Sequence, residues 1–272
     1  MQQVIIDHET WIRLTAFTLF FLLVAGWELL QPRRTLKVSK GLRWVNNLGV
    51  TALNTLLVRL LIPAGAVGAA GFAEAHQLGL LNLTPKARFW LDILAAVIIL
   101  DLIIYGQHVL VHKVQWLWRL HRVHHADLDF DVTTGARFHP VEILFSMVVK
   151  ISAVVIFGAP IISVILFEVI LNGMAMFNHG NVRLPSVLDK VLRRFLVTPD
   201  MHRIHHSINP SEANSNFGFN LSLWDRLFGT YKANASHDQT LMTIGTPGFR
   251  SKTSTVMLSG MLCQPFSKSN KE

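Results

Sequence analysis

The chain has 272 residues, of which 51% are hydrophobic and 15% are charged, and its mean hydropathy is +0.38. These values exclude an ordinary soluble domain and predict a single membrane domain over residues 1–272. The formal net charge of +8 indicates basic residues at helix ends rather than a nucleic-acid partner, because no basic stripe alternates with stacking aromatic residues.

The first predicted membrane span covers residues 11–30, since about 20 mostly apolar residues cross a bilayer. Asp7 and Glu9 precede this span, where a signal peptide would carry basic residues, so we expect an anchor. The loop that follows, residues 33–43, holds five basic residues and no acid. That composition predicts a loop on the cytosolic side.

A second span is predicted over residues 48–72, with a bend at Pro63. Three glycines of this span, Gly65, Gly68 and Gly71, follow no strand. They indicate close helix packing rather than a dinucleotide-binding loop. A third apolar span is predicted from Phe89 to about Gln107.

Residues 141–177 are long and largely apolar, with a break at Gly158-Ala159-Pro160. This pattern predicts a helical hairpin, formed by two short spans or by a re-entrant pair. With the N-terminus outside, five crossings return the chain to the cytosol. The predicted fold is an all-α integral membrane protein of about four to five transmembrane helices. It includes the hairpin, a cytosolic helical cap, and a soluble tail over residues 232–272.

Eight of the thirteen histidines fall into three clusters with the three- and four-residue spacing of one helix face. These candidate metal ligands are His108, His112, His121, His124, His125, His202, His205 and His206. Imidazole is the commonest neutral metal ligand at physiological pH. Eight rings are too many for a single zinc ion, which takes about four ligands. The clusters therefore predict a site for two metal ions on the cytosolic face.

Two polar stripes, each a row of polar side chains along one helix face, extend from this region into the apolar helices. Asp101 and Tyr105 share a predicted helix face with His108 and His112. An aspartate inside an apolar run normally faces a partner. We therefore expect Asp101 to meet a histidine ring N–H or a metal-bound water.

The second arm of the hairpin carries the other stripe. Glu168, Asn172 and His179 lie on one helix face, and His179 ends it at the cytosolic edge. Ala175 occupies the position between them and leaves a gap. Two polar stripes from separate helices are thus expected to meet at the membrane boundary, with His179 as a further ligand.

The remaining histidines divide into two kinds. His139 precedes Pro140 and is interpreted as a metal ligand, as a contact to a ligand, or as the cap of the hairpin helix. His8, His76 and His237 stand alone and are interpreted as ordinary interfacial residues. Neutral nitrogen ligands suit zinc, copper, iron and nickel alike. Iron with dioxygen would oxidise C–H bonds, and a site at the mouth of a bundle can meet an acyl chain or sterol.

The order of these motifs resembles the fatty acid hydroxylase, or sterol desaturase, superfamily. The resemblance rests on HxxxH, HxxHH, Asn178-His-Gly-Asn181 and HRIHH, and on the flanking residues 117–125, 134–142 and 216–231. It covers approximately residues 33–231, which is most of the chain. Several spaced motifs in the same order make it highly specific.

The resemblance implies a non-haem di-iron centre of two Fe ions, O2 as co-substrate and an external electron donor that is cytochrome b5-, ferredoxin- or reductase-like. It also implies a membrane lipid, such as a sterol, fatty acyl chain or ether lipid, that is hydroxylated or desaturated. The implied ligands are His108, His112, His121, His124, His125, His179, His202, His205 and His206. Some members have a tenth histidine where this chain has Ala175. That ligand is then absent, replaced by water, or supplied by His139.

Two readings from other classes compete with an oxygenase. A metal transporter would place its ligands near the midplane of repeated halves, whereas these ligands lie at helix ends. A non-catalytic protein that keeps the metal for stability would have lost ligands at several motifs. For the location we expect a bacterial inner membrane, with the endoplasmic reticulum membrane as the alternative.

Overall fold

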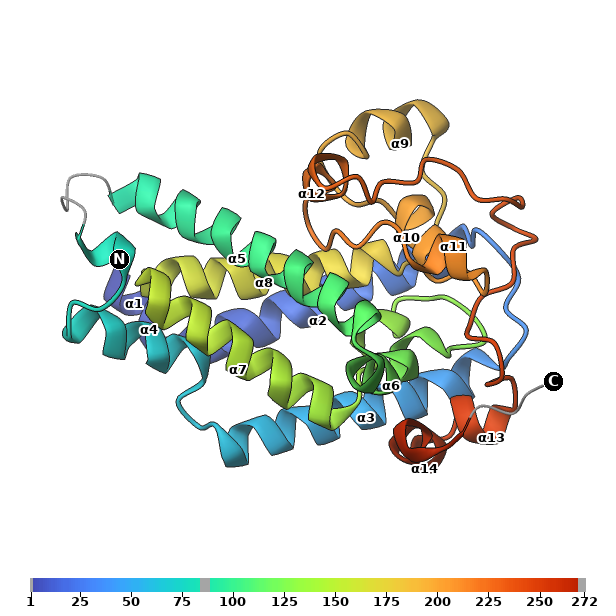
Figure 1. Cartoon of the computed structure of the whole chain (residues 1–272), viewed down its shortest axis with the longest axis horizontal. Helices are drawn as coiled ribbons and strands as arrows, with labels where there is room; N and C mark the ends of the chain where they lie inside the picture. Colours follow the sequence, from blue (N-terminus) through green and yellow to red (C-terminus); the bar gives the residue numbers. More distant parts are fainter. Residues whose placement is uncertain (1, 84–88, 269–272) are drawn as a thin grey trace.

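The computed structural model describes residues 2–83 and 89–268, and in this part of the chain the regular elements are all helices. Long apolar helices run side by side as an antiparallel bundle (Figure 1). They are α2 (Glu9–Leu30), α3 (Lys40–Leu61), α5 (Phe89–Lys113), α7 (Pro140–Phe157) and α8 (Ile161–Asn178). Five candidate spans lie in the described residues. Large apolar side chains such as Leu23 and Trp90 are exposed along them, as lipid contact requires. The chain is therefore a multi-pass membrane protein, as predicted.

The second span differs from the single bent helix predicted over residues 48–72. Helix α3 begins earlier, at Lys40, and its 22 residues extend about 33 Å, enough to cross the hydrocarbon layer without help. Pro63 follows the end of α3 because proline cannot continue the hydrogen-bond ladder. Gly65 has a φ of +57° and redirects the chain into the short helix α4 (Gly65–Ala75). The predicted bend is thus a complete break between two helices.

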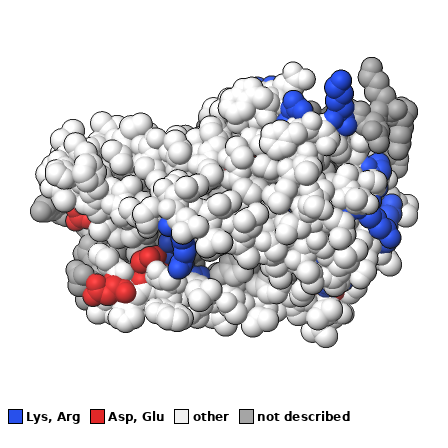
Figure 2. Space-filling model, turned by 90° about the horizontal axis from the view of Figure 1, so that it is seen from below, with Lys and Arg blue, Asp and Glu red and all other residues white. Residues whose placement is uncertain are grey.

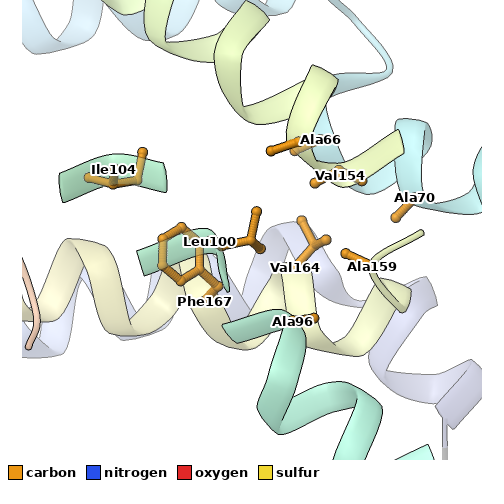
Figure 3. Close-up of a cluster of buried hydrophobic side chains, with 10 residues drawn as sticks. Ala66, Ala70, Ala96, Leu100, Ile104, Val154, Ala159, Val164 and Phe167 are labelled. Atoms are coloured by element: carbon orange, nitrogen blue, oxygen red, sulfur yellow. The ribbon is translucent and has the colours of Figure 1, made fainter. Parts of the chain in front are cut away.

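Helix α4 closes the bundle at the end far from the three histidine clusters (Figure 1). Its buried Ala66 and Ala70 pack against side chains of α5, α7 and α8 (Figure 3). The small residues let the backbones approach closely, so van der Waals contact holds the helices together in a lipid environment. The predicted close packing is thus made by these alanines. Of the three glycines, a Cβ at Gly71 would meet α8 only at an ordinary 3.7 Å, from Ile161, and a Cβ at Gly65 would have no neighbour within 4 Å.

The hairpin is formed by two full helices, α7 and α8. Gly158 ends α7 in the left-handed conformation with a φ of +65°, and Pro160 precedes α8. A Cβ at Gly79 would lie 2.1 Å from the backbone nitrogen of Gly158, so the hairpin turn packs tightly against the short connection after α4. Each arm is long and apolar enough to cross a membrane, which favours the first of the two hairpin arrangements.

A cap of short helices covers the opposite end of the bundle (Figure 1). It comprises α6 (Gln115–His125), η3 (Thr134–Ala136), α9 (Ser186–Leu192), α10 (Pro199–His205), α11 (Pro210–Ala213) and α12 (Leu223–Leu227). The segment predicted as a soluble tail adds α13 (Lys252–Thr255), α14 (Leu258–Cys263) and η4 (Gln264–Phe266). On the face in Figure 2, basic side chains gather mainly over the cap and acidic ones over the other end.

The tail packs onto the cap rather than standing apart from it. Met261 of α14 is fully buried against Val50 of α3 and Val123 of α6. The backbone N–H of Leu258 donates to Asn46 Oδ1 at 2.8 Å. Helix α6, which carries the central histidine cluster, is therefore held in place by contacts with α14.

Candidate metal centre

The fold brings nine histidines from four places in the chain to one site between bundle and cap. The last turns of α5 supply two of them, α6 supplies three, the residue after α8 supplies one, and α10 with its C-cap supplies three. They form two groups, and within each group one nitrogen of every ring lies within 4.8 Å of the others. The groups are His108, His112, His121, His125 and His205, and then His124, His179, His202 and His206.

In the five-histidine group, the Nε2 atoms face one another in pairs. His108 Nε2 lies 3.0 Å from His205 Nε2, and His112 Nε2 lies 3.1 Å from His125 Nε2. The fifth member, His121, has a buried Nε2 atom that makes no hydrogen bond. These are the separations expected of nitrogens that surround a cation with metal–nitrogen bonds of about 2.0–2.1 Å.

The four-histidine group provides the sharper test of whether a metal fits. His179 Nε2 lies 3.0 Å from His202 Nε2, and 3.2 Å from the Nε2 atoms of both His124 and His206. One ring nitrogen carries at most one proton, so hydrogen bonding cannot satisfy three nitrogen neighbours together. A cation at the centre would satisfy all four lone pairs, and the residues present therefore fit a metal ion.

Three of these histidines have their other ring nitrogen fixed by a backbone oxygen. His108, His179 and His205 each donate from Nδ1 to a backbone carbonyl at 2.7 Å, those of Phe217, Ala175 and Ser215. A proton held on Nδ1 leaves the Nε2 lone pair for a metal, and such partners set the orientation of the ring.

Burial keeps the imidazoles of the four-histidine group neutral. Outside the membrane-spanning helices, burial lowers the pKa of His179 to about 4, and burial with neighbouring histidines lowers the pKa of His124, His202 and His206 far below the usual range. Neutral rings retain the lone pair that a metal needs. Phe138 stacks on His124 with ring centroids 4.3 Å apart, so an aromatic wall closes this side of the site.

Asp101, the acid of the first polar stripe, contacts the cap and not a histidine. Asp101 Oδ2 accepts hydrogen bonds from Trp224 Nε1 at 2.8 Å and from the backbone N–H of Leu221 at 3.2 Å. Tyr105 Oη lies 3.0 Å from Thr230 Oγ1. Both residues lie on the buried face of α5 as predicted. They join the bundle to the cap, because residues 221–230 fold back over α5.

The second stripe is an ion cluster within the bundle. Glu168 accepts from Lys150 Nζ at 2.7 Å and pairs with Arg13 at 3.1 Å. Asn172 donates to the backbone carbonyl of Glu168. Only His179 of this stripe reaches the histidine groups, because Glu168 and Asn172 lie two to three turns further into the apolar region.

His139 is the cap of α7, which was one of its three predicted roles. Its Nδ1 accepts from the backbone N–H of Val141 at 3.2 Å, and its Nε2 donates to the carbonyl of Leu262 at 3.3 Å. Neither ring nitrogen remains for a metal. The position of a tenth ligand is filled by Ala175, whose carbonyl holds His179. His8, His76 and His237 lie outside both groups.

Sequence reasoning missed the partner of His121. Glu142, in the first turn of α7, is buried and has Oε1 2.5 Å from His121 Nδ1. An acid in the first turn of a helix is favoured by the helix dipole alone, so Glu142 did not stand out in the sequence. Its place in the 134–142 motif, beside the histidines, was the available signal.

A buried charge network under the site was also missed. Arg43 of α3 forms ion pairs with Asp127 at 2.7 Å and with Asp131, and Arg137 lies 3.6 Å from Asp127. Burial opposes the charge of Asp127, but the guanidinium groups of Arg43 and Arg137 hold its pKa well below its usual range. This network fixes the loop that follows His125, and Arg43 had been read only as part of a cytosolic basic loop.

Apolar spanning helices with a buried set of convergent imidazoles at one end define a metal-binding membrane protein. The chain belongs to the fatty acid hydroxylase family, whose model matches residues 93–230, about half of the chain. It is 27% identical over 242 residues to ornithine lipid hydroxylase OlsE of Rhizobium tropici, covering 84% of this chain and 70% of that protein.

Two further relatives match over shorter stretches. Human alkylglycerol monooxygenase is 27% identical over 135 residues, 47% of this chain and 28% of its own length. Human cholesterol 25-hydroxylase is 26% identical over 144 residues, 52% of this chain and 51% of its own length. The chain thus spans less than a third of the first and about half of the second. No solved structure matches the chain significantly.

Proposed function

We propose that this protein is an O2-dependent oxygenase that hydroxylates a C–H position of a membrane lipid, with two Fe ions as its cofactor. The observation that carries the proposal is the pair of buried histidine groups. Imidazoles bind zinc, copper, iron and nickel, and membership of the family supports the choice of iron. When bound, the two irons would supply the O2-dependent oxidation of an unactivated C–H bond.

The proposed reaction replaces one C–H bond with a C–OH bond. One oxygen atom of O2 enters the lipid and the other leaves as water, with two electrons and two protons from an external cytochrome b5-, ferredoxin- or reductase-like donor. Desaturation is the alternative, in which two hydrogens leave neighbouring carbons and both oxygen atoms become water. Relatives named hydroxylase or monooxygenase support hydroxylation of a sterol, acyl chain or ether lipid.

The residues of this chain orient the ligands and keep the site dry. The carbonyls of Phe217, Ser215 and Ala175 hold protons on the outer ring nitrogens, which keeps the inner lone pairs directed at the two metal positions. Phe130 and Phe138 stack beside His179 and His124. Exclusion of water by such walls protects an oxidising site from side reactions.

We further propose that the cap faces the cytosol of a bacterial cell, with the site at the inner face of the inner membrane. The basic loop between α2 and α3 lies at the cap end, and basic side chains gather there in Figure 2. Lysine and arginine accumulate on cytosolic loops. An endoplasmic reticulum membrane is the alternative and would give the same topology.

Metal analysis of the purified protein tests this function. We expect about two irons per chain, as two groups of ligands require, and a loss of about one iron in His205→Ala and in His179→Ala, which each break one group. His237→Ala, an exposed histidine outside both groups, should keep the metal content of the wild type. One zinc per chain, or equal metal in all three variants, would overturn the proposal.

A further inference from the structure

A cavity of about 350 Å³ in the cap reaches the five-histidine group. Its lining includes His112 and His125 of that group, together with Trp118, Arg122, Asn214 and Phe249. His112 is the one member of the two groups that is partly exposed. The volume lies at the small end of the range of ligand sites, about 300–1,000 Å³, so it suits part of a lipid.

The cavity approaches the metal site from the polar side of the membrane boundary. Every lining residue belongs to the cap or to the last turn of α5, and α2, α3, α7 and α8 contribute none. A lipid whose tail lies along the apolar bundle would therefore place its head group in this cavity. The tail would point away from the cap.

One fixed positive charge marks the cavity. Arg122 is the sole lysine or arginine in the lining, and no aspartate or glutamate lines it. Its guanidinium lies over the ring of Phe249, 4.2 Å from the centroid, and Nη2 donates to the carbonyls of Ser267 and Gln264. These contacts hold the group in place without neutralising its charge.

Two polar atoms of the lining side chains are buried without partners. They are Arg122 Nε, a donor, and Thr246 Oγ1, a hydroxyl, and the two residues are 7% and 8% exposed. A buried polar group without a partner costs free energy comparable to a lost hydrogen bond. An oxyanion in the cavity would pair with the guanidinium charge and would supply the acceptor that such donors lack.

We propose that this cavity binds the oxyanion of the substrate's head group, a carboxylate or a phosphate, so that the oxidised carbon lies close to that head group. The proposal rests on the proposed oxygenase function and deepens it. It defines the substrate class as a lipid with an anionic group near the reacting carbon, and it gives Arg122 the role of a binding residue.

Binding of single-chain lipids to the metal-loaded protein in neutral detergent tests the proposal by calorimetry. The probes are an alkyl phosphate, a fatty carboxylate and an uncharged monoacylglycerol of equal chain length. Arg122→Gln should weaken binding of an anionic probe about 10- to 100-fold, as a lost charged hydrogen bond predicts, and leave the uncharged probe unchanged. Arg119→Gln, an exposed arginine of the same helix, is the matched control.

A second pair of variants covers the case in which Arg122→Gln fails to fold. Ala213→Phe narrows the cavity while keeping Arg122 and should weaken binding of the anionic probe, whereas the exposed Ala233→Phe should not. If these variants lose affinity only for the alkyl phosphate, or only for the fatty carboxylate, the affected probe identifies the chemical group that the cavity binds. Equal affinity of the anionic probes in wild type, Arg122→Gln and Ala213→Phe would overturn the proposal. The calorimetric measurement tests head-group binding and requires no turnover. Iron content and oxygenase activity are measured separately and test the proposed function.

Discussion

His121 Nδ1 lies 2.5 Å from Glu142 Oε1, and both side chains are buried. The contact joins α6 to the first turn of α7, so it couples a ligand helix of the cap to a helix of the bundle. It also leaves His121 Nε2 directed into the five-histidine group. A carboxylate on the outer nitrogen raises the basicity of the ring and fixes its orientation.

Removal of this carboxylate should loosen metal binding. Glu142→Ala is expected to lower the metal affinity of the five-histidine group about 10- to 100-fold, whereas Glu142→Gln, which can still accept from Nδ1, should retain most of it. Competition with a chelator of known affinity measures the change. Glu74→Ala, an exposed glutamate at the other end of the bundle, is the control. Equal affinity in Glu142→Ala and wild type would contradict the role.

The buried Arg43 should be essential for stability. Arg43→Met leaves Asp127 and Asp131 without their main partner, and breaking a buried pair by removing one member costs about 3–5 kcal/mol. Thermal unfolding in detergent should show a large loss of stability and an accompanying loss of metal. Arg59→Met on the exposed face of the same helix should change little. A similar melting temperature in both variants would show that the network contributes no stability.

Acid should destabilise the metal-free protein in a defined pH window. Burial lowers the pKa of His179 to about 4 in the folded state, while an unfolded histidine titrates near about 6.5. Between these values the unfolded chain binds more protons, so this contribution to stability is complete above about pH 6.5 and falls as the pH approaches 4. Unfolding of chelator-treated protein between about pH 8 and pH 4 measures it. His179→Gln should reduce the slope but not abolish it, because His124, His202 and His206 contribute with the same sign. An unchanged slope would refute the assignment.

The C-terminal helices should be required for the metal centre. Deletion of residues 258–272 removes the contact of Met261 with Val123 and the two carbonyls that accept from Arg122. Helix α6 loses its support, so we expect metal content to fall in the truncated protein. Cys263→Ser changes an exposed side chain of the same helix and should leave metal content unchanged. Full metal content after the deletion would contradict this dependence.

The sequence predicts the local parts of this structure well. Hydropathy and the breaks at Pro63 and Gly158 predict the spans, because helix formation and interruption depend on neighbouring residues. The spacing of His108 and His112, and of the two HxxHH clusters, predicts which rings share a helix face. These local rules predict that each cluster directs its rings to one side of its helix.

The contacts across the fold required the structure. Asp101 meets Trp224, more than a hundred residues away, and helical periodicity does not specify such a partner. The division of nine histidines into groups of five and four likewise depends on how α6 and α10 face each other. Glu142 satisfied a local rule for helix N-termini, so its long-range role beside His121 remained hidden in the sequence.

The docking of α14 and η4 on α6 implies an order of assembly. A nascent chain that has emerged only as far as His206 carries the nine clustered imidazoles and the five candidate spans of the described residues, but lacks the segment that contacts Val123 and Arg122. Such a chain has the histidines but not the contacts that hold α6 in place. Metal ions are thus expected to bind stably only after α14 and η4 have docked on α6.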